Sequence, residues 1–389
     1  MSTGERMNTT STVAIVRCGS YEQAEVQEAV TRGLGLLGGA AAFVKTPGET
    51  ILLKPNLLTG RSPDRVVTTH PSVFRAVATA FQSAGVTLTY GDSPGFGKPQ
   101  TAAQKAGLFD IARELNIPLA EFVRGDIVSF PEGIQNKQFT IARGALSADG
   151  IISLPKMKSH GLTRMTGAIK NQFGCVPGPL KAEFHARLPM AELFSQMLVD
   201  LNRLLNPRLF VMDGIVAMEG NGPQNGTPRP MNVLLISSDP VALDATVCRM
   251  IALNPKLVLP IQCGVESGLG ETEDIELLGD PIASFVNADF KVNRRPLPTT
   301  EQPGRPSRLA RRHVVPKPFI VASKCTKCGT CVSVCPVEPK AIEFRGSGRA
   351  NPPIHDYMRC IRCYCCQELC PEGAIEVKVP LLGKLIHRR

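Results

Sequence analysis

The first 290 residues alternate short apolar runs with amphipathic stretches. The apolar runs have the composition of buried strands: TVAIVR (12–17), ILLKPN (51–56), VTLTYGD (86–92), IISLP (151–155), RLFVMDG (208–214) and VLLISSD (233–239). The amphipathic stretches have helical spacing and cover residues 22–37, 71–84, 100–115, 189–205 and 239–252. Near-continuous apolar strands that alternate with helices predict a mostly parallel sheet with helices on both faces. We therefore expect an α/β domain over residues 1–292.

The regular pattern stops after this domain. Residues 293–318 hold six prolines and seven basic residues and predict an extended linker, although its arginines also suit an anion or nucleic-acid patch. Residues 319–389 contain two cysteine runs that align cysteine for cysteine, 35 residues apart. Such a repeat indicates a duplicated half-domain, so we expect a small α+β domain here.

Charge and composition narrow the classes of function. The chain has 44 Lys+Arg against 34 Asp+Glu, and residues 291–389 alone hold 19 basic and 7 acidic residues. The absence of Trp argues against the aromatic stacking platforms of single-strand nucleic-acid binders, so nucleic acid is not the expected partner. No apolar run has the length of a signal-peptide core or a membrane span, and we expect a cytoplasmic protein. In that reducing compartment, thirteen cysteines predict metal binding rather than disulfides.

Eight of these cysteines form two runs of the pattern C-x2-C-x2-C-x3-C-P. In this pattern three close thiolates hold one [4Fe–4S] cluster and the fourth holds the other cluster. The predicted ligand sets are Cys325, Cys328, Cys331 and Cys370 for one cluster, and Cys360, Cys363, Cys366 and Cys335 for its twin. Zinc is the alternative, since C-x2-C pairs also bind zinc, but two matched runs that each end in proline favour the iron clusters. Cys365 is left over, either as a free thiol or as an alternative ligand or redox-sensitive thiol.

Residues 319–379 resemble the bacterial-type ferredoxin domain with two [4Fe–4S] clusters, including the AIEF and AIEV strands after each cysteine run. The resemblance implies single-electron transfer. A domain of this size builds little core, so we expect the clusters to hold it together. The excess of Lys and Arg over Asp and Glu in this part of the chain would stabilise the reduced clusters or steer an acidic redox partner protein.

Polar motifs follow several predicted strands of the α/β domain. Lys54 and Asn56 lie in KPNLL at the end of one strand, and Asp92 lies in GDSPG at the end of another. Ligands bind at this edge of open α/β sheets. The segment LPKMKSHGLTRMTGAIKNQFG adds basic and amide side chains, which suit an anionic ligand such as a carboxylate or phosphate. The candidate site residues are Lys54, Asn56, Asp92, Lys156, His160, Lys170, Asn171 and Glu219.

Several of these residues have a structural alternative. Asp92 in GDSPG also suits a turn, and His160 also suits an exposed surface position. Asp239 precedes Pro240 and an apolar helix, which favours an N-cap over a ligand contact. Lys54 at the inner end of a buried strand requires a partner or a ligand. No Walker, GxGxxG or HExxH motif is present, so neither a standard nucleotide loop nor a zinc hydrolase is indicated.

Five motifs, in order, resemble the domain of unknown function 362 family over residues 10–285: KPNLL, GDSPG, LPKMKSHGLTRMTGAIKNQFG, DGIVAMEGNGP and SSDPVALDA. The family name records no activity, so the resemblance implies no catalytic role.

We therefore expect a ferredoxin-type oxidoreductase whose two [4Fe–4S] clusters pass single electrons to or from a site in the α/β domain or a docked redox partner. The α/β site would bind a small anionic substrate or a metal. A non-redox enzyme with structural clusters is one alternative, and a metal or cluster assembly protein is another.

Overall fold

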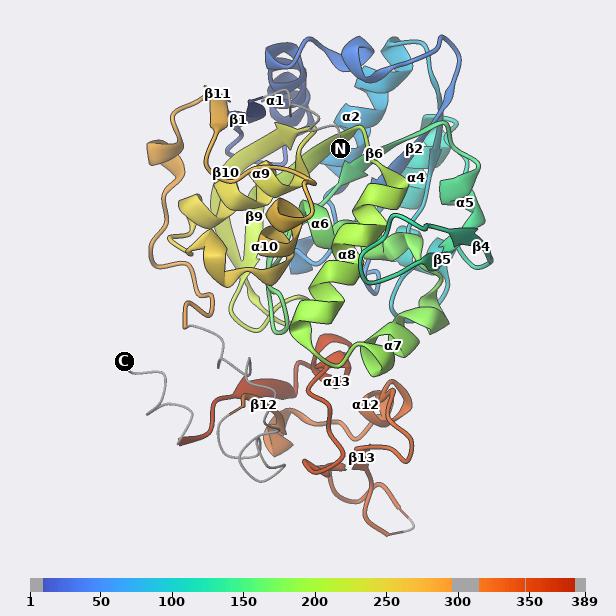
Figure 1. Ribbon diagram of the computed structural model, residues 1–389, viewed down its shortest axis with the longest axis vertical. Coiled ribbons are helices and arrows are strands. Elements are labelled where there is room, and N and C mark those ends of the chain that lie inside the picture. The colour runs from blue at the N-terminus through green and yellow to red at the C-terminus, as the bar shows by residue number, and fades with distance from the viewer. Residues whose placement is uncertain (1–9, 296–314, 347, 382–389) are drawn as a thin grey trace, which may run out of the picture.

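The structure is a computed structural model that describes residues 10–295, 315–346 and 348–381. Figure 1 shows a large N-terminal domain and a small C-terminal domain that lies against one end of it. Most of the predicted linker, residues 296–314, lies outside the described part of the chain.

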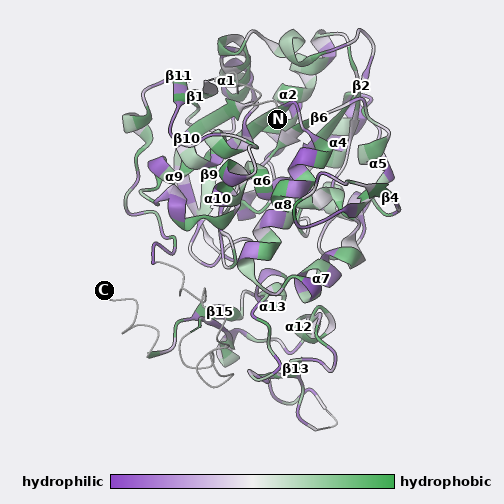
Figure 2. Cartoon of the chain, in the orientation of Figure 1, coloured by the Kyte–Doolittle hydropathy of each residue, from purple (hydrophilic) through white to green (hydrophobic). Residues whose placement is uncertain are grey.

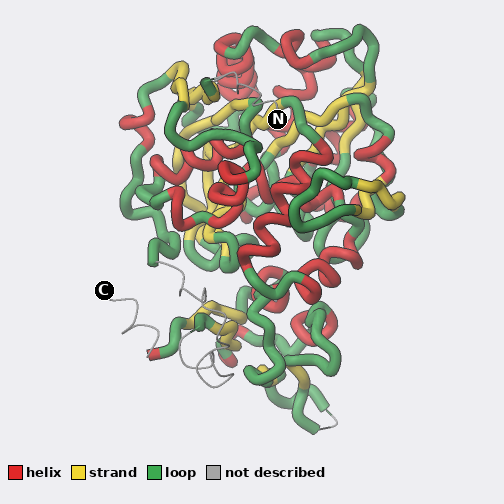
Figure 3. Tube along the Cα trace, viewed as in Figure 1, coloured by secondary structure: helices red, strands yellow, loops and turns green. Residues whose placement is uncertain are grey.

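The large domain contains a mixed, mostly parallel sheet (Figure 3). Its order is β11-β1-β10-β9-β6-β2-β3, with β7 beside β9 and β8 beside β7. The strands are β1 (Ser11–Arg17), β2 (Thr50–Pro55), β3 (Thr87–Tyr90), β6 (Gly150–Leu154), β7 (Lys156–His160), β8 (Arg164–Thr166), β9 (Leu209–Glu219), β10 (Thr227–Ser237) and β11 (Ile275–Gly279). The strand β10 is antiparallel to β1 and β9, and β8 is antiparallel to β7, whereas the remaining pairs are parallel. A separate hairpin joins β4 (Gly125–Ser129) and β5 (Gln138–Ala142).

Helices cover both faces of this sheet, which confirms the predicted α/β class. One face packs against α1 (Gln23–Leu36), α2 (Pro71–Ser83), α3 (Pro99–Lys105) and α4 (Leu108–Glu114). The other packs against α6 (Ala168–Asn171), α8 (Ala191–Leu205), α9 (Pro240–Met250) and α10 (Leu259–Glu266). The domain also contains α5 (Arg143–Leu146), α7 (Gly178–Arg187) and 3-10 turns at Ala40–Phe43, Pro63–Arg65, Gln172–Cys175, Pro255–Leu257 and Ile282–Phe285.

The alternation of side chains along the strands explains the two apolar layers. In β1, Ala14 and Val16 enter the cluster on one face, whereas Val13 and Ile15 enter the cluster on the other. Successive side chains of a strand point to opposite faces, so a strand buried on both sides must be apolar throughout. Figure 2 shows hydrophobic colour along the central strands and hydrophilic residues on the outer helix α7.

One expectation about the elements was wrong. The segment 100–115 forms two helices, α3 and α4, because Gly107 between them takes a left-handed conformation with φ of 73°. Glycine adopts that conformation without the steric penalty that a side chain brings. The antiparallel direction of β10 agrees with a mostly parallel sheet, and it follows because β9 and β10 are joined directly rather than through a helix.

The small domain consists of two similar halves with little regular structure. Its elements are β12 (Lys317–Ile320), a 3-10 turn at Ala322–Lys324, α12 (Thr330–Ser333), β13 (Ile342–Glu343), β14 (Ile354–His355), α13 (Cys365–Glu368) and β15 (Ile375–Lys378). The left-handed residues Lys327 and Gly329 of the first cysteine loop correspond to the left-handed Arg362 and Tyr364 of the second. The AIEF and AIEV segments each contain a strand, as predicted. The backbone thus supports a duplicated half-domain.

Candidate ligand pocket and cluster sites

A buried ion pair lies at the carboxyl ends of the parallel strands β2 and β3. Lys54 Nζ lies 2.8 Å from Asp92 Oδ1, and both side chains are almost fully buried. Lys54 also donates to the backbone oxygen of Pro55 at 2.9 Å. Asp92 Oδ2 accepts a hydrogen bond from the Leu57 amide at 2.7 Å. The lysine at the inner end of the strand therefore has its partner within the protein.

Two asparagines extend this polar group from β2 to α6. Asn171 Oδ1 accepts from Lys54 Nζ at 3.2 Å and from Asn56 Nδ2 at 3.1 Å. Asn56 Oδ1 in turn accepts from Lys158 Nζ at 2.7 Å. The segments around KPNLL, GDSPG and the long basic motif therefore converge, as expected from their positions after neighbouring strands.

A cavity of about 330 Å³, which we call the interdomain pocket, has Asn56, Asp92, Lys158 and Asn171 in one wall. Its polar lining from the large domain consists of Asn56, Asp92, Ser93, Lys158, Thr166, Lys170, Asn171, Lys181 and His185. Its lining from the small domain consists of Val334, Cys365, Glu368 and Leu369. The pocket therefore lies between the two domains, with the second cysteine loop as part of its wall.

Three lysines line this pocket without a carboxylate at ion-pair distance among the described residues: Lys158, Lys170 and Lys181. Burial, then the positive charges of Lys170 and Lys156, lower the pKa of Lys158 well below its usual range. Burial lowers the pKa of Lys181 to about 7, although Asp92 opposes that shift. Concentrated positive charge in a desolvated cavity disfavours protonation, and a bound anion would relieve that cost.

His160 joins the two domains beside the pocket. Its Nε2 lies 3.0 Å from Glu368 Oε1, across the domain boundary. Its Nδ1 accepts the backbone amides of Leu162 at 3.0 Å and Thr163 at 3.2 Å. Nδ1 therefore carries no proton, so Nε2 is the protonated nitrogen of a neutral ring. Burial would raise the pKa of Glu368, but the neighbouring His160 and Lys170 outweigh burial and lower it. The alternative of an exposed surface histidine is wrong, because His160 is buried.

Further contacts hold the small domain against this edge of the sheet. Gln224 Nε2 and Asn225 Nδ2 both donate to the backbone oxygen of Cys370, at 3.1 and 3.0 Å. Gln367 Nε2 donates to Asn221 Oδ1 at 2.8 Å. The last cysteine of the second run is thus fixed to the large domain through its own backbone.

Four of the eight predicted site residues lie outside the pocket lining. Lys156 Nζ pairs with Asp213 Oδ2 at 2.8 Å and donates to Tyr21 Oη at 2.7 Å. Glu219 accepts a hydrogen bond from the Lys291 amide at 2.9 Å. Its charged neighbours are the side chains of Arg229, at 3.8 Å, and Lys291, at 3.7 Å. Lys156 and Glu219 therefore form separate groups, whereas Asn56, Asp92, Lys170 and Asn171 line the pocket itself. Lys54 lies behind Asp92, and His160 lies beside a second interdomain cavity.

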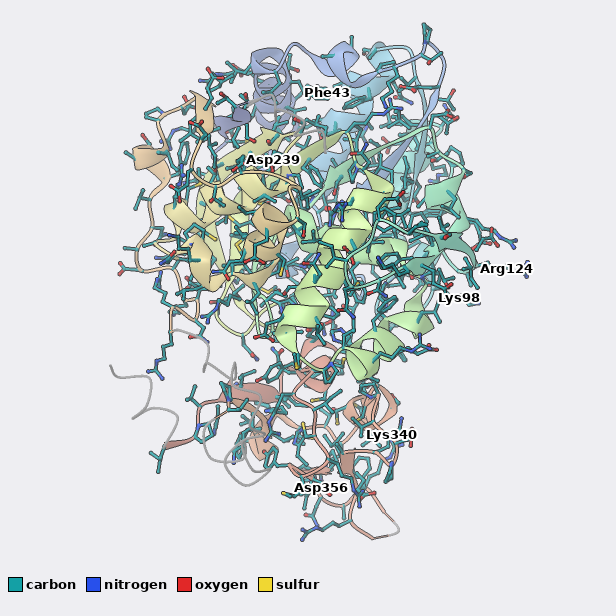
Figure 4. The ribbon with its side chains drawn as sticks, in the orientation of Figure 1. Phe43, Lys98, Arg124, Asp239, Lys340 and Asp356 are labelled. Atoms are coloured by element: carbon teal, nitrogen blue, oxygen red, sulfur yellow. The ribbon has the colours of Figure 1, made fainter. Side chains whose placement is uncertain are left out.

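Asp239 confirms its predicted role as an N-cap. Its Oδ1 accepts from the amides of Val241 at 2.7 Å and Ala242 at 2.9 Å, at the start of α9. Figure 4 labels Asp239 in the upper part of the large domain, far from Lys340 and Asp356 in the small domain. Its position excludes it from the interdomain pocket.

Sequence reasoning missed several pocket residues. Lys181 and His185 lie on α7, whose amphipathic pattern is weak, and burial lowers the pKa of His185 to about 4. Thr166 has a buried hydroxyl with no hydrogen-bond partner in the described part of the chain. Glu368 was not predicted, because it belongs to the small domain and the sequence does not show that this domain lines the pocket. Lys158 was visible in the KMKSH motif, where its spacing of two from Lys156 places both lysines on the same face of β7.

The cysteines gather in the interleaved arrangement that their spacing suggests. Cys325, Cys328, Cys331 and Cys370 line one small cavity of the small domain. The pKa of Cys331 is raised to about 12 by burial and then by the nearby thiolates of the same set, Cys370, Cys325 and Cys328. The donor set and the cavity fit one [4Fe–4S] cluster, with Cys370 crossing from the second run.

The second set is packed around Cys366. Burial, then the proximity of Cys363 and Cys360, raises the pKa of Cys366, and Cys335 of the first run is also among its charged neighbours. Cys335 and Cys366 lie in one packed cluster with Cys331 and Cys370 of the first set, and Cys360 packs against it. We propose this set as the ligands of the twin cluster. Cys365 is buried beside Cys363 and faces the interdomain pocket.

Two absences among the described residues bear on these sites. No three His, Cys, Asp or Glu side chains among them are arranged to hold a single metal ion. None of the described helices is both long and apolar enough to cross a membrane.

Comparisons with known proteins match both domains. Residues 51–249 match the family described as "Domain of unknown function (DUF362)", and residues 324–374 match the family described as "4Fe-4S dicluster domain". The dicluster match implies two [4Fe–4S] clusters, and a ferredoxin domain of this kind suggests electron transfer.

Two curated proteins are similar to the chain. The "Thylakoid-associated protein sll1697" of Synechocystis sp. is 39% identical over 261 residues, which are 67% of this chain and 80% of that protein. The "NADH-quinone oxidoreductase subunit I" of Pelobacter propionicus is 38% identical over 63 residues, which are 14% of this chain and 33% of that protein.

Proposed function

Because the chain belongs to the DUF362 family, whose description assigns no activity, we propose a function from the site itself: two [4Fe–4S] clusters exchange single electrons with a small anionic substrate in the interdomain pocket. The observation that carries this proposal is the composition of the pocket wall. Lysines from the large domain face residues of the second cysteine loop across one cavity.

The charges of the pocket favour an anionic substrate. The Lys54–Asp92 pair is internally neutral, and Glu368 is directed at His160. Lys170 and Lys181 therefore leave positive charge for a ligand to balance. The Thr166 hydroxyl, which has no partner among the described residues, offers a further hydrogen bond. Carboxylates and phosphates are the groups that such a set of donors binds best.

The position of the second cysteine loop supports the redox part of the proposal. Cys365 and Glu368 of α13 line the pocket, and Cys363 and Cys366 on either side of Cys365 are proposed cluster ligands. A substrate in this pocket would contact Cys365, which is the neighbour of one proposed cluster ligand in the sequence and lies two residues from another. Covalent linkage also keeps the electron carrier at a high effective concentration. The relative named as a subunit of NADH-quinone oxidoreductase matches over a short segment of similar length to the small domain, which agrees with an electron-carrying role.

Anaerobic purification of the full chain tests the proposal. Iron and sulfide should each approach about eight per chain, and mass spectrometry should find a co-purifying anionic small molecule. The double variant Lys170→Met/Lys181→Met should retain the iron and lose that molecule, whereas Lys105→Met on the exposed surface should retain both. A small molecule that remains bound to the double variant in unchanged amount would contradict the pocket assignment.

A further inference from the structure

We propose that Lys158 is a catalytic amine, which forms an imine with a small aldehyde or ketone that carries an anionic group. The proposal rests on the proposed function only in placing the ligand in the interdomain pocket.

The partners of Lys158 distinguish it from the other buried lysines on the same sheet edge. Lys54 and Lys156 each lie 2.8 Å from a carboxylate oxygen, of Asp92 and Asp213 respectively. Lys158 Nζ instead contacts two neutral acceptors, Asn56 Oδ1 and the backbone oxygen of Val67, each at 2.7 Å. A buried ammonium without a counter-charge is costly, whereas a neutral amine at this position is not.

The number of acceptors suits a neutral amine. An uncharged lysine has two N–H groups, and the side chain of Asn56 and the carbonyl of Val67 accept both. The bond to Cε and the two N–H bonds occupy three of the four tetrahedral directions of Nζ, so the fourth holds the nitrogen lone pair. Lys158 lines the interdomain pocket, so that direction is available to a carbonyl carbon bound there.

The surroundings also favour the nucleophilic form. Burial and the nearby positive charge of Lys170 lower the pKa of Lys158 well below that of an ordinary lysine. Desolvation and a neighbouring cation are the two means by which enzymes activate a lysine for attack on carbonyl substrates. The neutral amine is thus more abundant near neutral pH than it is for a surface lysine.

Other pocket residues supply the remaining interactions of such a substrate. Lys170 is half-buried and lines the cavity, so it suits the anionic group. Thr166 is 3% exposed and its hydroxyl has no partner among the described residues, so it suits the oxygen of the carbonyl or of the carbinolamine. One pocket therefore contains an amine, a cation and a free hydroxyl.

The chemical step is balanced without a further reagent. The Lys158 nitrogen attacks the carbonyl carbon, a C–N bond forms, and the proton on nitrogen passes to oxygen. That oxygen leaves as water with one further proton from solvent, and the nitrogen keeps its second N–H proton, which gives the iminium, C=N–H⁺. The resulting iminium accepts electrons more readily than the parent carbonyl, which suits a pocket beside an electron carrier.

Reductive trapping with pyridoxal 5′-phosphate, a phosphorylated aldehyde, tests this inference. The anaerobic holoprotein is mixed with less than one equivalent of the probe and reduced with borohydride, and the modified peptide is identified by mass spectrometry. The expected product is a stable adduct on Lys158, reduced several-fold in yield by excess sulfate. Lys158→Arg should abolish that adduct, and Lys105→Arg should leave it unchanged. Adducts confined to Lys170, Lys181 or exposed lysines would overturn the proposal.

A second variant keeps the test valid if Lys158→Arg fails to fold. Asn56→Asp places a carboxylate 2.7 Å from Lys158 Nζ with almost no change in shape. The carboxylate should favour the ammonium, so the yield of adduct should fall at least several-fold at pH 7 and recover at higher pH. An unchanged pH profile would contradict a nucleophilic role. Trapping is read by mass, so its failure is distinguishable from a failure of cluster redox activity.

Discussion

At the scale of single residues, the buried charges show what the sequence could and could not predict. Lys54, Asn56 and Asp92 follow apolar strands, so their convergence at one sheet edge was predictable from position alone. The partner of Lys54 was not, because either a ligand or a carboxylate would satisfy a lysine there. The structure supplies Asp92. Thr166 and Glu368 were beyond prediction, since their roles depend on contacts between distant segments.

Removal of one member of the Lys54–Asp92 pair should strongly destabilise the large domain. Lys54→Met leaves the Asp92 carboxylate buried without its counter-charge, so we expect the free energy of unfolding to fall by about 3–5 kcal/mol. Urea denaturation followed by circular dichroism measures the change. Arg143→Ala, which removes the exposed pair with Asp126, is the control and should leave the midpoint nearly unchanged. A loss as small as that of the control would show that the buried pair is not required.

Anion binding in the pocket should weaken as pH rises. The pKa of Lys181 is lowered to about 7 by burial, so this side chain is protonated below about pH 7 and neutral above it. Sulfate keeps its double negative charge over this range, and we expect it to bind several-fold more weakly at pH 8 than at pH 6. Isothermal titration calorimetry measures the affinities.

Lys181→Arg is the matched variant for this pH profile, because arginine stays protonated throughout. Its sulfate affinity should vary much less between the two pH values. An equally steep profile in Lys181→Arg would assign the effect to another group.

At the scale of elements, the apolar pattern predicted the buried strands of the sheet and the helices that cover its two faces. It missed elements whose sequences are polar. The six apolar runs all became strands of the large sheet. The strand β7, KMKSH, is fully buried yet largely polar, so hydrophobic periodicity gave no signal for it. The helix predicted over residues 100–115 was too long, because the prediction did not treat Gly107 as a helix break.

The N-cap of α9 provides an element-scale prediction. Asp239 accepts two helix amides and also the Glu271 amide at 3.0 Å. Asp239→Ala should therefore lower the free energy of unfolding by about 0.5–2 kcal/mol, towards the upper end of that range. Thermal denaturation followed by circular dichroism checks the change. Asp239→Asn retains an acceptor and should cost less, and an equal loss in both variants would contradict the capping role.

At the scale of the whole molecule, the two domains were predictable as separate units but their docking was not. The cysteine spacing pointed to the small domain, and alternating elements pointed to the large one. The contacts of Gln224 and Asn225 with the Cys370 carbonyl carry no pattern in the sequence. The interdomain pocket, which depends on that docking, was therefore visible only in the structure.

Loss of the clusters should unfold the small domain and leave the large one intact. The helices α12 and α13 have four residues each, far below the length at which isolated helices are stable. Anaerobic chelation of iron should abolish hydrogen-exchange protection over residues 315–381, while β6 and β9 keep theirs. Retained protection of the small domain in the iron-free chain would show that the clusters are not needed for its fold.

Potentiometric titration of the anaerobic full chain, followed by electron paramagnetic resonance, tests most directly whether the clusters exchange electrons with the pocket. The account predicts that both clusters take up and release one electron reversibly, and that sulfate in the pocket lowers the potential of the cluster nearer to it. The shift arises because a bound anion disfavours the additional negative charge of the reduced cluster. It should vanish in Lys170→Met/Lys181→Met. The contradictory result is that neither cluster cycles at any accessible potential.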